Sequence, residues 1–359
     1  MRTLVSSFAL MVLACGAPQQ RFPLRSPMWI DDDQAPFAGP PSAIDTATAK
    51  WDGIDHTLFR QLSERWLWQR DTEAINVNSM DEVPNSSWFQ NRIGFSPFTR
   101  ERLARGACGM TSEPPRPWVV VRAKLNGASP GMVVRDAGGH MYLLKVDFDL
   151  PERGTAADAI GTRLLWAAGY NTPCNNVVFF NRDELAIADD EAAPSPEEVD
   201  GLLAIAGRLP DGRIRGSLSR FMDGTPLGGW VFSGLRANDP NDVVPHEHRR
   251  EPRGMYVLSA WLNHIDSREE NNLDMWIEDG PGLGHVRHYV LDAGDSFGQI
   301  FPQSLVMTQS FGLSHYLDLQ HIAEDFLTLG IAERPWLGAT RGPASDVLGF
   351  YDVERFDPN

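Results

Sequence analysis

The chain has 359 residues, of which 42% are hydrophobic and 10% aromatic; this composition is typical of a folded protein and excludes an intrinsically disordered one. Its length allows one large domain or two of ordinary size. The formal net charge of −16 excludes a protein that grips DNA or RNA through their phosphates, so no nucleic-acid partner is expected.

The first residues predict export. Arg2 supplies positive charge, and the apolar run LVSSFALMVLA that follows is too short to span a bilayer as a mature helix. The run ends in VLACG, where a small residue precedes Cys15 behind two aliphatic residues. This order resembles the lipobox of bacterial lipoproteins, in which the cysteine becomes the lipidated first residue. An ordinary secretory signal with cleavage nearby is the alternative.

The lipobox resemblance implies a signal peptide at residues 1–14 and a lipid anchor on Cys15 that tethers the protein to the bacterial cell envelope. Gly16 after the cysteine implies the outer membrane. Residues 15–45 are rich in Pro, Asp and Gln and are interpreted as a tether between lipid and fold. Export also allows disulfides, but whether Cys108 and Cys174 pair is left open.

Residues 46–116 contain a predicted helix near 57–68 and the aromatic, polar segment DEVPNSSWFQNRIG (81–94), and this region is expected to pack on the main domain. From residue 117 three short β-rich runs follow, WVVVRAKLNG, GMVVRDAGG and HMYLLKVD. A helix is then predicted in TAADAIGTRLLWAAGY, a strand in NNVVFFN, an insert with a capped helix in SPEE, and a strand in RIRGSLSRFM.

The remaining part, residues 225–359, reads as mostly helical with one β-hairpin, LDMWIED and HVRHYVLD, turned by GPG at 280–282. The predicted fold is therefore α+β and bilobal: a small antiparallel sheet with one helix at 117–224, and a mostly helical lobe at 225–359. This second lobe is expected to be short or truncated.

The stretch WLNHIDSREENNLD contains polar residues in an order that suggests phosphoryl transfer. Phosphoryl transfer from a nucleotide needs a cation for the phosphates, a carboxylate that orients the acceptor, and an Asn and an Asp that hold Mg²⁺. Asp266 and Asn271 have the spacing of the Asp and Asn in H-R-D-L-x-x-x-N, and His264 occupies the place of its His. Asn272 is the competing choice for the metal ligand.

The other parts follow in the required chain order. Asp292 begins the D-A-G of LDAGDSFG after a strand, as the metal-binding Asp of D-F-G does. Lys145 lies in the third strand, and Asp158 on the next helix is its acidic partner. The loop from Lys124 to Gly131 lies between the first two strands and matches a glycine-rich phosphate loop poorly.

Lysine is scarce in the sequence. Of 32 basic residues only three are lysines, at positions 50, 124 and 145. Each matched position also has an ordinary structural explanation: Lys145 as a strand residue that reaches solvent, Asp266 and Asp292 as turn residues, Asp158 as an exposed helix residue. The order of the four signals favours the functional interpretation.

With these motifs the chain resembles the protein-kinase-like superfamily, nearest its atypical HipA-type and phosphatidylinositol-kinase-like branch, and also a group of secreted bacterial lipoproteins. The segments that carry the resemblance are DEVPNSSWFQNRIG, MYLLKVD, DAIGTRLLWAAGYNTP, RGSLSRFMDGTPLG, NDVVPHEHRREPRG, WLNHIDSREENNLD and HYVLDAGDSFG.

The resemblance implies ATP or another nucleotide and Mg²⁺ as cofactors, with an acceptor that the sequence does not define. Lys145 would hold the phosphates with Asp158 as its partner, Asp266 would orient the acceptor, and Asn271 and Asp292 would bind the metal. Three alternatives stay open: nucleotidyl transfer on the same fold, a pseudokinase that only binds or scaffolds, and an unrelated α+β envelope protein.

Overall fold

The computed structural model describes residues 32–44, 74–95, 97–109, 113–124, 131–147, 154–262, 264, 267, 269–298, 323, 326–329 and 331. The predicted signal peptide, the lipidation candidate Cys15, the helix expected near 57–68 and the catalytic candidate Asp266 lie outside the described residues. Among the residues that are described, no helix combines the length and apolar character needed to cross a bilayer.

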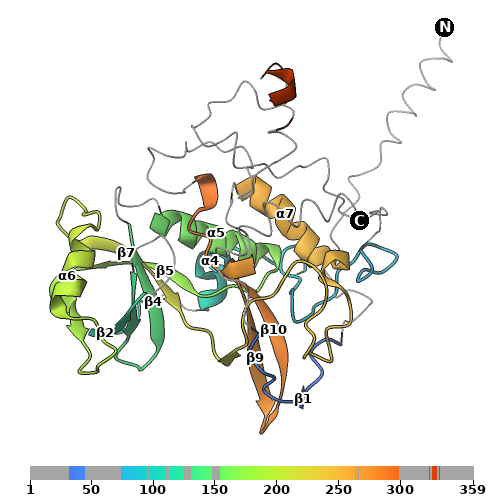
Figure 1. Cartoon of the computed structure of the whole chain (residues 1–359), viewed down its shortest axis with the longest axis horizontal. Helices are drawn as coiled ribbons and strands as arrows, with labels where there is room; N and C mark the ends of the chain where they lie inside the picture. The colour runs from blue at the N-terminus through green and yellow to red at the C-terminus, as the bar shows by residue number, and fades with distance from the viewer. Residues whose placement is uncertain are drawn as a thin grey trace, which may run out of the picture.

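The described chain forms two sheets flanked by helices, which confirms the predicted α+β class (Figure 1). One sheet has six strands in the order β5-β7-β4-β3-β2-β6, antiparallel except for the parallel pair β2–β6. The other has four strands in the order β1-β10-β9-β8 and is antiparallel.

The strands are β1 (Phe37–Ala38), β2 (Trp118–Ala123), β3 (Gly131–Arg135), β4 (Met141–Val146), β5 (Asn175–Phe180), β6 (Leu185–Ile187), β7 (Ile214–Arg220), β8 (Thr225–Pro226), β9 (Asn272–Gly280) and β10 (Leu283–Val290). The α-helices are α4 (Arg100–Arg105), α5 (Gly154–Ala168), α6 (Pro196–Ala204) and α7 (Arg250–Leu262). Short 3₁₀ turns are η2 (Gly106–Cys108), η3 (Arg182–Glu184), η4 (His246–His248), η5 (Glu269–Asn271) and η6 (Ser296–Gly298).

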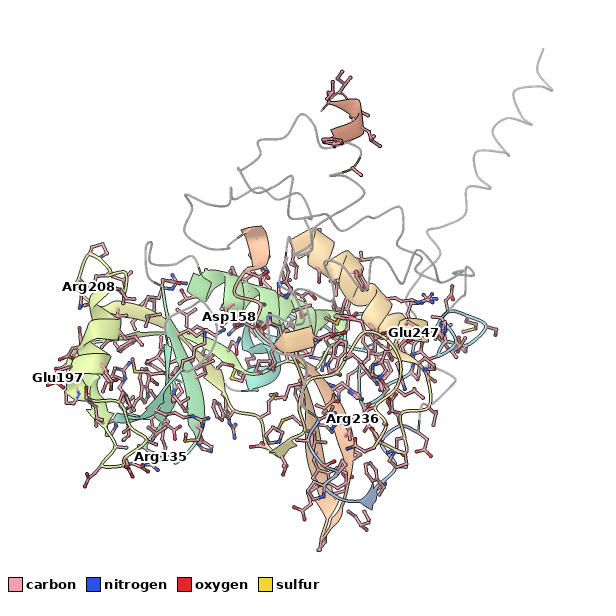
Figure 2. The ribbon with its side chains drawn as sticks, viewed as in Figure 1. Arg135, Asp158, Glu197, Arg208, Arg236 and Glu247 are labelled. Carbon is pink, nitrogen blue, oxygen red and sulfur yellow. A yellow bond between two sulfur atoms is a disulfide. The ribbon has the colours of Figure 1, made fainter. Side chains whose placement is uncertain are left out.

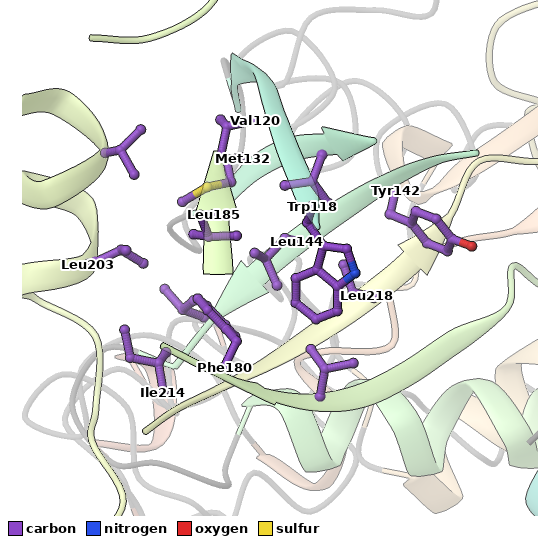
Figure 3. Packing of buried hydrophobic residues seen from close by; sticks show 14 of the residues in the cluster. Trp118, Val120, Met132, Tyr142, Leu144, Phe180, Leu185, Leu203, Ile214 and Leu218 are labelled. Atoms are coloured by element: carbon purple, nitrogen blue, oxygen red, sulfur yellow. The ribbon is translucent and has the colours of Figure 1, made fainter. Parts of the chain in front are cut away.

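One face of the six-stranded sheet carries the main apolar core. The period of two along β4 sends Tyr142, Leu144 and Val146 to this face, where all three are buried. They pack with Trp118, Val120, Met132, Phe180, Leu185, Ile214 and Leu218 from neighbouring strands, as Figure 3 shows. Helix α6 covers the core with Val199 and Leu203.

Helix α6 begins where the sequence predicts. The Ser195 hydroxyl accepts from the Glu198 N–H at 3.2 Å, and the Glu198 carboxylate accepts from the Ser195 N–H at 2.8 Å. This capping box satisfies two backbone donors that the first turn otherwise leaves without partners. The predicted insert therefore folds onto the sheet, and a short strand that the sequence analysis did not anticipate, β6, precedes it.

Helix α5 lies on the opposite side of the six-stranded sheet and runs toward the β9–β10 hairpin (Figure 1). Asp147, at the end of β4, caps its first turn: Thr155 donates to it from its N–H at 2.8 Å and from its hydroxyl at 2.7 Å. A second apolar cluster joins α5 and α7 to the end of the hairpin; it contains Trp88, Leu165, Tyr170, Trp230, Phe232, Met255, Leu262, Val290 and Ala293.

The four-stranded sheet consists mainly of the predicted hairpin, whose strands are joined at Pro281 and Gly282. Residues 32–44, which the sequence assigns to the tether, include β1, and this strand pairs with β10. Phe37 of β1 meets the ring of Trp276 edge-on with centroids 4.9 Å apart. This part of the chain is therefore packed against the sheet.

The two cysteines beyond the lipobox form a disulfide, Cys108–Cys174, with Cα atoms 4.5 Å apart. It ties η2 to the residue before β5, across a sequence separation of 66. Arg163 of α5 reinforces the same junction by donating to the carbonyls of Ala104 and Asn175 at 2.7 and 2.9 Å.

The double variant Cys108→Ser/Cys174→Ser is expected to lose about 4 kcal/mol of unfolding free energy in urea, because the disulfide removes loop-closure entropy from the unfolded chain. A reductant should lower the midpoint of the wild type to that of the variant and leave the variant unchanged. Equal midpoints for oxidised wild type and variant would contradict this role.

Candidate functional site

Lys145 points away from the apolar core. Because its neighbours Leu144 and Val146 face the core, the alternation along β4 places the lysine side chain on the face that carries α5. Its partner in the β4–β7 ladder is Ser217, and its partner in the β3–β4 ladder is Gly131. Directly paired residues share a face, so these three positions form a row across the sheet.

The Lys145 ammonium pairs with a carboxylate from the other sheet. Its Nζ lies 2.7 Å from Oδ1 of Asp292, which follows β10. Asp292 adopts a positive φ of 37°, rare for a residue with a side chain, and its Oδ1 accepts from the Gly294 N–H at 3.2 Å. The contact therefore joins two predicted site residues that lie far apart in the sequence.

The ion pair keeps both the Lys145 and the Asp292 side chain ionised. Burial disfavours the ionised carboxylate, but the Lys145 ammonium outweighs this effect and lowers the pKa of Asp292 to about 2. Burial likewise opposes the ammonium, yet Asp292 and Asp158 together raise the pKa of Lys145 above its ordinary value. At neutral pH the lysine is a cation and Asp292 an anion.

Asp158 of α5 is buried beside this pair and held by two neutral donors. Ser217 donates to its Oδ2 at 2.7 Å, and Asn175 donates to its Oδ1 at 2.8 Å. Figure 2 shows it near the middle of the molecule. Burial raises the pKa of Asp158, with Lys145 acting in the opposite direction and Asp292 in the same one. Among the described residues, the ion-pair partner of Lys145 is Asp292 and not the expected Asp158.

A glycine allows α5 to approach the loop after β10. A Cβ on Gly161 would lie 2.8 Å from both the Ala293 Cβ and the Ser296 hydroxyl oxygen. Asp158 lies one turn earlier on the same helix, and a Cβ on Gly294 would lie 3.9 Å from the Asp158 Cβ. Close packing at Gly161 therefore sets how near the carboxylate of Asp158 comes to the Lys145–Asp292 pair.

Lys145 and Asp158 line a small cavity of about 30 Å³ at the first turn of α5, and Asp292 lies outside its lining. Its lining residues are Lys145, Val146, Asp147, Gly154, Thr155, Asp158, Ser217 and Gly294. Strands β4 and β7, helix α5 and the loop after β10 all contribute to it. A group at the mouth of this cavity would meet the Lys145 ammonium together with the carboxylates of Asp147 and Asp158.

Asn271 lies next to Asp292 in space. The Leu291 N–H donates to the Asn271 carbonyl at 2.7 Å, so the end of η5 and the start of the loop after β10 run side by side. The competing candidate, Asn272, is buried, and its Nδ2 has no hydrogen-bond partner among the described residues.

The chemistry of these donors suits a hard cation, because Mg²⁺ prefers carboxylate and amide oxygens and keeps several waters. Within the described ranges no group of three or more His, Cys, Asp and Glu side chains is arranged around a metal position. A magnesium site would therefore depend on Asp292 and Asn271, with the remaining ligands from water and phosphate.

His264 connects the end of α7 to the loop after β10. Its Nδ1 lies 2.6 Å from Oδ1 of Asp295, and the imidazole is buried. The His264 N–H donates to the Ser259 carbonyl of α7 at 2.8 Å. The residue two positions later, Asp266, lies outside the described residues, so its predicted role stays a prediction.

A buried polar network supports the hairpin below the site. Asp274 of β9 is fully buried and accepts from Arg236 at 2.7 Å, while the Nδ1 of His288 lies 2.6 Å from its other oxygen. Figure 2 shows Arg236 beside this hairpin. The His288 ring stacks on Trp88 with centroids 3.7 Å apart. Pairing the carboxylate with a guanidinium and an imidazole nitrogen offsets much of the cost of burying it.

The arginines of HEHRREPRG act as scaffold. Arg249 is fully buried, with its guanidinium 5.4 Å from the Trp88 ring centroid and 3.9 Å from Asp33. Arg250 contacts Asp81 at 3.1 Å, and Arg253 donates to the Glu247 carbonyl at 2.8 Å. These contacts hold residues 74–95 and 32–44 against α7.

Sequence reasoning missed three residues that orient the site: Ser217 and Asn175, which hold Asp158, and Asp295, which contacts His264. Ser217 gives little signal, since it alternates with Arg215 and Ser219 on the polar face of β7, away from the core residues Ile214 and Leu218. Asn175 and Asp295 give none, because their roles come from contacts across the fold.

No protein-family model matches the chain, and no curated protein is significantly similar to it. The functional argument therefore depends on the geometry of the site.

Gly161→Ala and Gly201→Ala form a matched pair of helix substitutions. Gly201 on α6 has open space around it, so alanine there should raise the unfolding free energy by about 0.5–1 kcal/mol through helix propensity. Alanine at Gly161 should instead lower it by about 1–3 kcal/mol, because the methyl group collides with Ala293 and Ser296. Urea unfolding measures both, and equal stabilisation would contradict the close approach.

Proposed function

We propose that this protein is a kinase-like phosphotransferase that uses ATP and Mg²⁺ and is tethered to the bacterial envelope through a lipid on Cys15. The observation that carries the proposal is the 2.7 Å contact between the strand lysine Lys145 and Asp292 of the D-A-G loop. It supports a site where Lys145, Asp158, Asp292 and Asn271 come together from four separate segments.

In this proposal the six-stranded sheet with α5 forms the smaller lobe and α7 with the hairpin forms the core of the larger one. The phosphates would lie beside the first turn of α5, where the Lys145 ammonium would neutralise their charge. Asp158, fixed by Ser217 and Asn175, keeps a second carboxylate near that ammonium and restrains its position.

Asn271 and Asp292 would hold a magnesium ion, which when bound supplies charge neutralisation for the phosphate chain. The low pKa of Asp292 keeps its carboxylate ionised throughout the physiological range. Asp266 would orient the acceptor hydroxyl and accept its proton. His264 supports that segment by contacting Asp295 of the loop after β10.

Thermal unfolding with and without ATP and Mg²⁺ tests the proposal. At an ATP concentration about 100 times the dissociation constant, binding should add about 2.7 kcal/mol and raise the melting temperature of the wild type by about 5 °C. Lys145→Met and Asp292→Asn should abolish the shift. Transfer of labelled γ-phosphate should fall at least about 100-fold in both variants.

Absence of a shift in the folded wild type contradicts nucleotide binding. A shift without phosphate transfer to any acceptor or to water would favour the pseudokinase alternative. Release of pyrophosphate in place of ADP would favour nucleotidyl transfer.

A further inference from the structure

A second lysine lies beside the site. Lys124 follows the last residue of β2, and its N–H donates to the Gly131 carbonyl at 3.2 Å, where the chain returns in β3. Of the three lysines in the sequence, two therefore lie at the end of β2 and in β4, the strands on either side of β3, although arginine is the usual cation of this chain. The sequence motif around Lys124 gave little reason to select it.

Gly131 leaves room for the Lys124 side chain. Gly131 pairs directly with Lys145, so a side chain at 131 would share the face of Lys145. A Cβ built at that position would lie 3.3 Å from the Cδ of Lys124. The aliphatic stem of Lys124 thus passes over the empty position in the row Ser217–Lys145–Gly131.

The ammonium of Lys124 shares the electrostatic environment of the site. Burial lowers its pKa, the Lys145 ammonium lowers it further, and the carboxylates of Asp292 and Asp158 act in the opposite direction. These are the same groups that determine the charge state of Lys145. Two ammonium groups and two carboxylates therefore interact here, and a more highly charged anion that contacts both ammonium groups would compete with the carboxylates for them.

We propose that Lys124 is a second phosphate-binding lysine, so that the site takes a chain of two or more phosphates, with Lys145 and Lys124 contacting different phosphates. The inference rests on the proposed function and specifies its ligand class as a polyphosphate. A compact ammonium on a flexible stem suits a phosphate oxygen. Lys124 would add a second ammonium group for the phosphates that lie beyond the reach of Lys145.

The test compares Lys124→Met, which keeps the stem and removes the charge, with Lys124→Arg and with Arg122→Met. Arg122 is exposed and lies two residues earlier at the end of the same strand, so it controls for loss of any nearby positive charge. The probes are ATP, AMP and inorganic tripolyphosphate, each with Mg²⁺, and affinities come from calorimetry or competition with a fluorescent nucleotide.

Lys124→Met should weaken ATP and tripolyphosphate about tenfold, the size expected for one charge-assisted hydrogen bond, and lower the ratio of ATP to AMP affinity by the same factor. Lys124→Arg should recover most of the loss, and Arg122→Met should bind like the wild type. Unchanged circular dichroism and melting temperature establish that the variants fold.

Wild-type affinity for tripolyphosphate in Lys124→Met overturns the inference while leaving the proposed function intact. An equal loss for AMP and ATP also overturns it, because that pattern indicates a structural role. If the wild type binds tripolyphosphate through Lys124 but does not bind ATP, the role of Lys124 is supported and the proposed use of a nucleotide is wrong. A wild type that binds none of the probes overturns both.

Discussion

The ion pair between Lys145 and Asp292 links the two sheets that the described residues form. Lys145 comes from the central β4 of one sheet, and Asp292 from the loop after β10 of the other. Ion pairs that water still reaches typically contribute at most about 1 kcal/mol. The pair therefore matters less for stability than for position, since it fixes the Lys145 ammonium against the Asp292 carboxylate.

Two features make that position possible. Gly161 lets α5 lie against Ala293 and Ser296, which brings Asp158 to the pair, and the buried Asp274 holds the hairpin through Arg236 and His288. Losing one partner of such a buried network costs about 3–5 kcal/mol, so the hairpin end has little freedom to shift. Packing and buried charge thus determine where the loop after β10 begins.

Much of the fold follows from local patterns. The alternation in MYLLKVD placed Lys145 on the face away from the core, the SPEE segment gave the start of α6, and the GPG segment gave the hairpin turn. The pairing of Cys108 with Cys174 and the strand β6 did not follow, because both depend on which segments come together in space. The same limit applies within the site: spacing selected Lys145 and Asp292, but assigned Asp158 as the direct partner of the lysine.

The scarcity of lysine pointed to Lys124 more strongly than the sequence motif of the loop that follows it. The segment from Lys124 to Gly131 fits a glycine-rich loop poorly, yet Gly131 is the position whose missing side chain makes room for Lys124. The composition marks lysine as an unusual residue type in this chain, but only the strand register shows that Gly131, beside Lys124, is paired with Lys145. A pattern search that weighs rare residue types by their position in a sheet would have found it.

The most direct test of the central claim is a crystal of the full chain soaked with a non-hydrolysable ATP analogue and Mn²⁺. The account predicts an anomalous manganese peak bound by oxygens of Asp292 and Asn271, with phosphate oxygens within hydrogen-bonding distance of the Lys145 Nζ. An analogue bound elsewhere, with no manganese at Asp292 and the Lys145–Asp292 contact unchanged, would contradict it.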